Sequence, residues 1–231
     1  MSNLESAIQL VLTFDAGLFQ VIELSLIVSL SAVCLAALIG VPFGALIALN
    51  PFPGRAFIVV VINALMGLPP VVVGLIVYLS LSRSGPLGSW GILFTPQAMI
   101  IAQTVLIAPI IAALTRQTIA DYWVEYRDEL MAMNIGPVSR VMTLIWDARF
   151  SLMTALLAGF GRAAAEVGAV IVVGGNIDGF TRTMTTTIAL ETSKGDLPRA
   201  IALGVVLIAI IVAINGLAWC AQRVTARYAG A

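Results

Sequence analysis

Long stretches of this sequence contain no charged residue. Three of them, residues 24–54, 56–82 and 84–115, each exceed the roughly 20 apolar residues that a helix needs to cross a hydrocarbon core about 30 Å thick. Of the 231 residues, 60% are hydrophobic and only 10% are charged, whereas an average soluble domain is about 25% charged. The sequence therefore predicts an integral membrane protein.

We expect an all-α membrane protein with five transmembrane helices. The apolar pattern places them near residues 19–49, 57–81, 96–119, 150–173 and 199–222, with an external segment 1–18 before them and a cytoplasmic tail 223–231 after them. If the charged loop between the third and fourth spans is cytoplasmic, seven arginines lie inside, and the outside holds Arg83, Arg182, Lys194 and Arg199. The positive-inside rule then predicts an external N-terminus.

Two glycine-rich sequences inside the spans predict how the helices pack or bend. In the first span, Gly40 and Gly44 form a small-xxx-small pattern that lets two backbones approach closely. In the second, Gly67-Leu-Pro-Pro70 interrupts the apolar run, and prolines remove backbone donors and bend or break a helix. We expect close packing at the first and a kink or a pore-lining break at the second.

The composition argues against several function classes. The 12 basic and 12 acidic residues cancel, and no basic stretch is interleaved with aromatic residues, so a nucleic-acid surface is not expected. There is no histidine and no cysteine or acidic cluster with ligand spacing, so no metal site is expected either. The only lysine, Lys194, does not stand in the Gly-Lys-Ser/Thr order that a phosphate-binding loop requires. We therefore predict no catalytic residue, no cofactor in this chain and no ATP hydrolysis by that route.

The densest cluster of charge lies in residues 120–149, between the third and fourth spans. Its members are Asp121, Glu125, Arg127, Asp128, Glu129, Arg140, Asp147 and Arg149. The pattern predicts a short helix over residues 121–134 and, after Gly136-Pro137, a second over residues 138–146 with Val138, Val141, Met142 and Ile145 on one stripe. Two short helices at an angle would form a knob that a soluble partner can bind; the alternative is a solvated connection.

Several sequences along the chain resemble one transporter family. Residues 129–136, Glu-Leu-Met-Ala-Met-Asn-Ile-Gly, followed by Asp147-Ala-Arg149, resemble the "EAA" coupling loop of type I ABC importer permeases, although Leu130 stands where that family usually has its acidic residue. Residues 159–168, 173–177, 181–191 and 194–196 are similar to the oxyanion branch of the family, and residues 68–74, 85–88 and 191–196 to its tungstate permeases. The resemblance covers about residues 23–222.

The resemblance implies a type I ABC transporter transmembrane domain with the MetI-like fold, spanning residues 19–222, in the cytoplasmic (inner) membrane of a prokaryote. It implies a homodimer in membrane lipid around a central pathway, an ABC ATPase subunit docked on residues 120–149, and an extracytoplasmic oxyanion-binding protein. The implied cargo is tungstate or a similar tetrahedral oxyanion, with molybdate or sulfate as alternatives. The residues expected to couple to the ATPase are Glu129, Ala132, Gly136, Pro137, Asp147 and Arg149.

Two groups of polar residues are predicted to line or gate the pathway. Arg162 and Glu166 are the only charges in the fourth span and lie four residues apart, so on one helix face they can pair at membrane depth; a structural clasp is the alternative. The external segment 174–198 combines hydroxyls with turn residues, which can solvate an anion without holding it tightly; an external cap is the alternative. Its predicted gate residues are Gly174, Gly175, Asn176, Thr181, Arg182, Thr185 and Thr186.

A function from a different class also stays open. A secondary transporter could use Arg162 and Glu166 as its ion-coupling pair, and it would transport without a partner ATPase. An intramembrane enzyme has little support because the sequence offers no histidine and no nucleophile next to a base.

Overall fold

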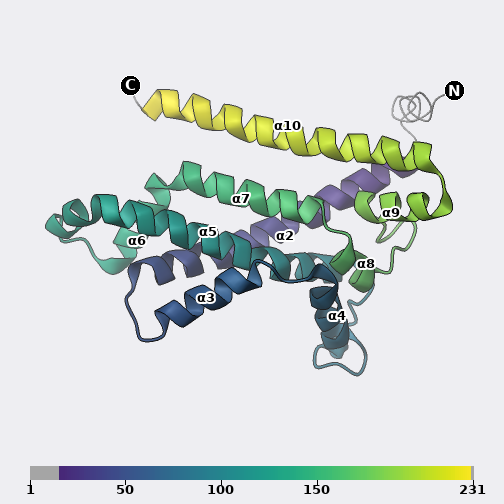
Figure 1. The fold of residues 1–231 in the computed structure, drawn as a ribbon, viewed down its shortest axis with the longest axis horizontal. Coiled ribbons are helices and arrows are strands. Elements are labelled where there is room, and N and C mark those ends of the chain that lie inside the picture. The colour runs from purple at the N-terminus through teal and green to yellow at the C-terminus, as the bar shows by residue number, and fades with distance from the viewer. Residues whose placement is uncertain (1–15, 230–231) are drawn as a thin grey trace. The chain divides into compact units, whose positions relative to one another are not determined.

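Helices form all the regular structure among the described residues. The computed structural model describes the backbone of residues 16–229 and the side chains of residues 17–223. The elements are α2 (Ala16–Leu49), α3 (Arg55–Leu65), α4 (Pro70–Leu81), the short 3-10 helix η1 (Gly88–Trp90), α5 (Pro96–Ala132), α6 (Pro137–Asp147), α7 (Arg149–Ala164), α8 (Gly168–Gly174), α9 (Met184–Lys194) and α10 (Leu197–Ala229) (Figure 1). Most of the predicted segments 1–18 and 223–231 lies outside the residues whose side chains are described.

The described residues contain three to five candidate spans, a range that includes the five predicted. Among the described residues, three helices are long and apolar enough to cross a membrane: α2, α5 and α10. Two bent pairs, α3 with α4 and α6 with α7, bring the number to five if each pair is counted as one span. The predicted all-α membrane fold is therefore confirmed.

The third span continues far beyond its predicted end at residue 119. Helix α5 has 37 residues, and at 1.5 Å per residue it is about 55 Å long, well over the roughly 30 Å of a hydrocarbon core. The sequence prediction of a separate short helix over residues 121–134 is therefore wrong. Residues 121–132 form the last turns of α5, because no glycine or proline interrupts the chain between Pro109 and Asn134.

The second predicted span is broken at the predicted place. Helix α3 ends at Leu65 and α4 begins at Pro70, so residues 66–69 separate the two helices. Pro70 occupies the first turn of α4, where its missing N–H is not needed for a hydrogen bond. Pro69 precedes it with an extended backbone, as expected for a residue before a proline.

The fourth predicted span, residues 150–173, is also two helices. Helix α7 ends at Ala164 and α8 begins at Gly168, so Glu166 lies in the break between them. The expectation that Arg162 and Glu166 share one helix is therefore wrong. Their pairing survives, as described below, because the chain between them still makes a turn.

The chain forms two compact units. Among the described residues, the first contains residues 16–32, 69–103 and 161–229, and the second contains residues 33–68 and 104–160. Three helices, α2, α5 and α7, each contribute one part to each unit. Below, each unit is described by itself.

The first unit is built on two helix pairs. Helix α4 packs against α8, where a Cβ added to Gly74 would lie 2.8 Å from the Cα of Ala169. Helix α9 packs against the start of α10 (Figure 1). Leu18 of α2 joins that pair through a buried cluster with Met184 and Leu203. This unit carries all of the predicted pathway residues.

The second unit depends on close contact between the later part of α2 and α5. A Cβ added to Gly40 would lie 3.0 Å from the carbonyl oxygen of Ala108. One added to Gly44 would overlap the carbonyl oxygen of Ala112 and lie 2.9 Å from the Cβ of Thr115. The small-xxx-small pattern therefore has the packing role predicted for it, because only glycine leaves room for the facing backbone.

We expect Gly44→Ala to destabilise the protein. The added methyl group meets backbone atoms that cannot rotate away, and overpacking of this kind costs about 1–3 kcal/mol. The matched control is Gly216→Ala in α10, where a Cβ would meet no atom within 4 Å. Thermal melting in detergent should show a lower transition for Gly44→Ala and an unchanged or higher one for Gly216→Ala. Equal melting of the two variants would contradict the close packing.

Candidate transport sites

The predicted coupling segment, residues 120–149, has a buried inner face. Leu130 of α5 and Leu144 of α6 are 6% and 0% exposed and belong to one cluster with Ala148. Trp123 and Val141 pack against that cluster. These contacts fix α6 against the end of α5, so the knob is part of the folded second unit and not a loose connection.

The turn between α5 and α6 is made differently from the sequence expectation. Asn134, not Gly136, has the left-handed conformation, with φ of 51°. Gly136 is extended, with φ of −64° and ψ of 160°, and a Cβ there would meet no atom within 4 Å. This turn therefore does not need the backbone freedom of a glycine at position 136. Arg140 holds the turn by donating to the carbonyl of Ile135 at 3.3 Å while its guanidinium lies over the Trp123 ring.

Helix α6 presents a second, exposed apolar face. Val138, Met142 and Trp146 are 75%, 65% and 68% exposed and follow one another at intervals of four residues. The sequence predicted that Val138, Val141, Met142 and Ile145 share one stripe, but they lie on two faces. Val141 and Ile145 pack against the buried cluster, whereas Val138 and Met142 are exposed. Exposed apolar rows of this kind mark interaction sites on folded proteins.

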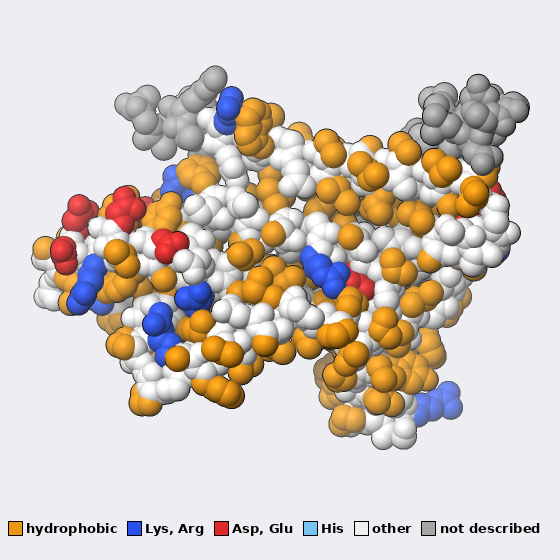
Figure 2. All heavy atoms as spheres, viewed as in Figure 1, with side chains coloured by type: hydrophobic (Ala, Val, Ile, Leu, Met, Phe, Trp, Pro, Cys, Tyr) orange, Lys and Arg blue, Asp and Glu red, His pale blue; other side chains and the backbone are white. Residues whose placement is uncertain are grey.

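Five of the six predicted coupling residues are exposed. They are Glu129, Ala132, Gly136, Pro137 and Asp147. Figure 2 shows acidic and basic side chains gathered where α5 ends and α6 begins. Arg149 differs, because it is half-buried, donates to the carbonyl of Trp146 at 2.7 Å and lies over the Trp146 ring. Its contacts within the chain are those of a residue that orients Trp146.

The break between α7 and α8 is held by four side chains, which we call the clasp: Gln103, Arg162, Glu166 and Thr185. Arg162 forms an ion pair with Glu166, whose side chain is 4% exposed. The Glu166 carboxylate also accepts from the Ala169 amide at 3.2 Å, at the start of α8. The carboxylate therefore joins the end of α7 to the start of α8.

Two further hydrogen bonds come from neighbouring helices. Gln103 of α5 donates to the carbonyl of Ala163 at 3.1 Å, and the Thr185 hydroxyl of α9 donates to the carbonyl of Glu166 at 2.8 Å. Both side chains are buried, at 3% and 8% exposed. Gln103 gives the Ala163 carbonyl a second partner, because that carbonyl also accepts from the Glu166 amide at 3.1 Å. Thr185 bonds to the Glu166 carbonyl, which a continuous helix would have satisfied itself. Gln103 could not be predicted from the sequence as a member of this site, because a single glutamine in an apolar run has no pattern around it.

The external segment 174–198 turns sharply before α9. Gly175, Asn176 and Gly179 all have positive φ, at 72°, 51° and 69°. The Thr181 hydroxyl ties the turn together by donating to the Gly174 carbonyl at 2.5 Å and accepting from the Ile177 amide at 2.9 Å. The predicted turn is therefore present, and its glycines and asparagine have backbone conformations that other residues rarely adopt.

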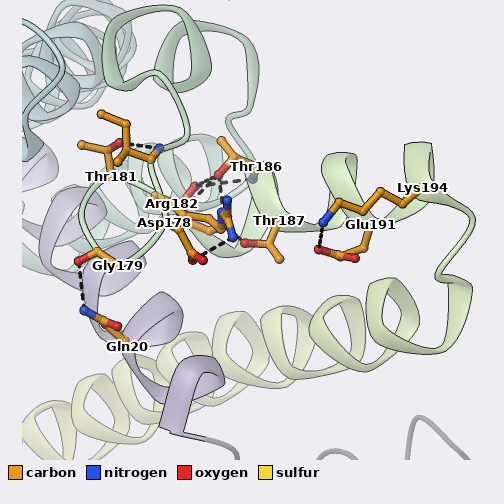
Figure 3. A network of polar contacts seen from close by, with 11 residues as sticks. Gln20, Asp178, Gly179, Thr181, Arg182, Thr186, Thr187, Glu191 and Lys194 are labelled. Atoms are coloured by element: carbon orange, nitrogen blue, oxygen red, sulfur yellow. Dashed lines mark hydrogen bonds and ion pairs between the residues drawn. The ribbon is translucent and has the colours of Figure 1, made fainter.

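The predicted gate threonines are buried and already bonded within this chain. Thr181 and Thr186 are 0% exposed. Thr186 belongs to a capping box with Thr183 at the start of α9, and Thr185 belongs to the clasp. Figure 3 shows Thr181 in the turn and Thr186 at the start of α9. Their hydrogen bonds stabilise the turn and the start of α9. A role of these threonines at the pathway stays a prediction.

Arg182 is the charged residue among the predicted gate residues of the external segment. Its guanidinium pairs with Asp178 at 2.7 Å, and its side chain is 21% exposed while that of Asp178 is 79% exposed. Lys194 pairs with Glu191 at 3.0 Å in the same network (Figure 3). Both basic groups of the external segment are therefore neutralised locally in this conformation.

We expect Arg162→Ala to destabilise the protein more than Glu166→Ala. Removing the arginine leaves a carboxylate that is 4% exposed without its counter-charge, whereas removing the glutamate leaves an arginine that is 33% exposed. Breaking a buried pair costs about 3–5 kcal/mol, and partial exposure reduces this for Glu166→Ala. The double variant should melt above Arg162→Ala. Thermal melting of the three variants tests this, and a parent-like Arg162→Ala would rule out the clasp.

The chain is similar to several known transporter permeases over most of its length. No protein-family model matches it. It is 41% identical over 205 residues to a probable anion ABC transporter permease protein of Haloferax volcanii, covering 87% of this chain and 88% of that protein. It is 39% identical over 218 residues to TupB, the tungstate uptake system permease protein of Peptoclostridium acidaminophilum, covering 94% and 96%. It is also 27% identical over 188 residues to ModB, the molybdenum transport system permease protein of Escherichia coli, covering 77% and 82%.

The alignment with TupB includes both the coupling segment and the external segment, since it covers nearly the full length of both proteins. The long apolar helices add that the protein is a multi-pass membrane protein. At this identity and coverage, the chain belongs to the ABC transporter permease family.

Proposed function

We propose that this chain is the transmembrane subunit of an ATP-driven importer for tungstate or a similar tetrahedral oxyanion. The observation that carries the proposal is the difference in identity between its relatives: 39% to a tungstate permease and 27% to a molybdenum permease. Molybdate and sulfate remain the alternative cargoes, because tetrahedral oxyanions of equal charge differ mainly in size.

The proposed ATPase contact is the outer face of α6. Val138, Met142 and Trp146 form an exposed apolar row, and the inner face of the same helix is buried in the second unit. A helix whose inner face is packed and whose outer face is exposed and apolar can bind a partner and transmit movement between it and the rest of the unit. Glu129, Gly136 and Asp147 lie exposed beside it, as docking residues would.

The remaining parts of the proposal concern the pathway and the assembly. Two copies of the chain would enclose the pathway in the inner membrane of a prokaryote, and a binding protein outside would deliver the anion. The clasp would hold the broken fourth span beside that pathway, and the external segment would form its outer gate. Arg182 would attract the anion only after release from Asp178, with which it is paired here.

Transport assays in proteoliposomes test the cargo and the energy source together. We expect tungstate uptake by the permease with its ABC ATPase and binding protein to require ATP. Unlabelled molybdate and sulfate, added separately, should compete less well than unlabelled tungstate. Uptake driven by an ion gradient without the ATPase would instead support the secondary transporter. Stronger competition by molybdate or sulfate would reassign the cargo and leave the ABC mechanism in place.

Met142→Glu tests the proposed ATPase contact. A charge placed in an apolar interface is costly unless it is paired, so the amount of co-purified ATPase should fall at least about tenfold, a change worth about 1.4 kcal/mol. The permease itself should melt as the parent does, because Met142 is 65% exposed. The matched control is Val124→Glu on α5, where the side chain is 82% exposed but lies outside α6. Equal loss in both variants would contradict a contact centred on α6.

Gly136→Val separates docking from folding at the same place. The backbone there is extended and a Cβ would meet nothing within 4 Å, so the permease should fold and melt normally. If a partner approaches the bare backbone closely, the valine should still reduce co-purified ATPase. Retention of both normal melting and normal ATPase binding would remove Gly136 from the docking surface.

A further inference from the structure

A cleft of about 440 Å³ opens in the first unit beside the external segment. The early part of α2, the turn at residues 178–180, α9 and the first turn of α10 line it. Several of its residues are labelled in Figure 3, where Gln20 reaches from α2 to donate to the Gly179 carbonyl at 3.0 Å. The cleft is lined by apolar as well as charged side chains, because Leu24 and Ile27 contribute to the same wall.

The charges in the cleft leave one free group of each sign. Of its three acidic and three basic residues, Asp178 pairs with Arg182 and Glu191 pairs with Lys194. The other two are Glu23 and Arg199. Within the described part of the chain, neither of their side chains has an ion-pair or hydrogen-bond partner, and Glu23 is exposed while Arg199 is half-buried. The cleft therefore has no net charge but can receive both an anion and a cation.

The same two residues are the first charges within the described parts of α2 and α10. Glu23 is the last charge before the uncharged residues 24–54, and Arg199 is the last before the uncharged residues 200–222. Both belong to helices long and apolar enough to cross a membrane. Charged side chains at this position in a span lie at the level of the lipid headgroups. The cleft is thus placed where a headgroup lies, with Ile27, which is 49% exposed, on the side of the acyl chains.

We propose that this cleft binds a zwitterionic phospholipid whose headgroup carries a phosphate and a primary ammonium, as in phosphatidylethanolamine. The Arg199 guanidinium would bind the phosphate through charge-assisted hydrogen bonds, and the Glu23 carboxylate would accept from the ammonium. An acyl chain would follow Leu24 and Ile27. The inference requires only that the chain spans a membrane, and it does not depend on which anion is transported.

The charge pattern favours this ligand over the transported anion or an anionic lipid. A tetrahedral oxyanion brings two negative charges into a cleft with three carboxylates and no excess of basic groups. An anionic headgroup would use Arg199 but would leave Glu23 unpaired beside the phosphate. Only a ligand with both charges satisfies both free groups.

Native mass spectrometry of the full-length chain in mild detergent tests the proposal. Phosphatidylethanolamine and phosphatidylglycerol are added separately, and the retained lipids are counted. We expect the parent to retain phosphatidylethanolamine about tenfold more strongly than phosphatidylglycerol, a ratio that one charge-assisted hydrogen bond can supply. Arg199→Gln should lose both lipids. Glu23→Gln should lose the preference for phosphatidylethanolamine while still binding phosphatidylglycerol, a reversal that general destabilisation would not produce.

The matched control is Arg83→Gln, which removes an exposed arginine that does not line the cleft; it should retain lipid as the parent does. Melting curves exclude unfolding, and Arg199→Lys should restore part of the binding. Equal retention of both lipids by the parent, or loss of lipid in Arg83→Gln, would overturn the proposal.

Displacement of the lipid by tungstate would identify the cleft as a cargo site instead. Equal competition by soluble phosphoethanolamine would rule out a lipid source, and a change in dimer fraction without bound lipid would identify a second copy as the occupant.

Discussion

A helix that is interrupted inside a membrane exposes backbone groups that lipid cannot hydrogen-bond. In the first unit this constraint applies most directly between Ala164 and Gly168, where α7 ends and α8 begins. The carbonyls of Ala163 and Glu166 receive hydrogen bonds from Gln103 and Thr185, and the Ala169 amide donates to Glu166. One short break therefore connects α5, α7, α8 and α9, and the arrangement of the first unit depends on it.

The same bonds limit what the polar residues of this unit can do in the described conformation. A threonine hydroxyl has one proton to donate, and those of Thr181 and Thr185 go to the carbonyls of Gly174 and Glu166. They cannot at the same time donate to a passing anion. If these residues contact the anion during transport, the segment must first change conformation, which would couple opening of the outer gate to loosening of the clasp.

The second unit combines close packing with an exposed contact surface. Gly40 and Gly44 let α2 approach α5 to backbone contact, and α5 then continues as one helix into the coupling segment. Leu144 and Ala148 fix the inner face of α6 against its end, which leaves Met142 and its neighbours exposed. A rigid path of this kind can carry a displacement from a docked ATPase into a transmembrane helix, because packed interiors transmit movement instead of absorbing it.

Several features could be predicted from the sequence because they depend on composition or on neighbouring residues. Uncharged runs identify spans, Pro69 and Pro70 break the second span, and Gly40 with Gly44 predicts close packing. The resemblance in the coupling and external segments likewise identified the permease family, which the relatives confirm. The cargo, the homodimer and the partner contacts stay predictions, since they involve molecules other than this chain.

The sequence by itself determined that this chain is a helical membrane permease, because apolar run length and local motifs are properties of neighbouring residues. Only the tertiary structure decided how those helices end and what their polar groups do. No local sequence signal shows whether residues 121–134 form their own helix or continue α5, and none predicts that Gln103 bonds to the Ala163 carbonyl. The left-handed conformation is adopted by Asn134, although a glycine stands two residues later. Such choices depend on partners distant in sequence, whose packing and hydrogen bonds select one backbone path among several that local preference permits.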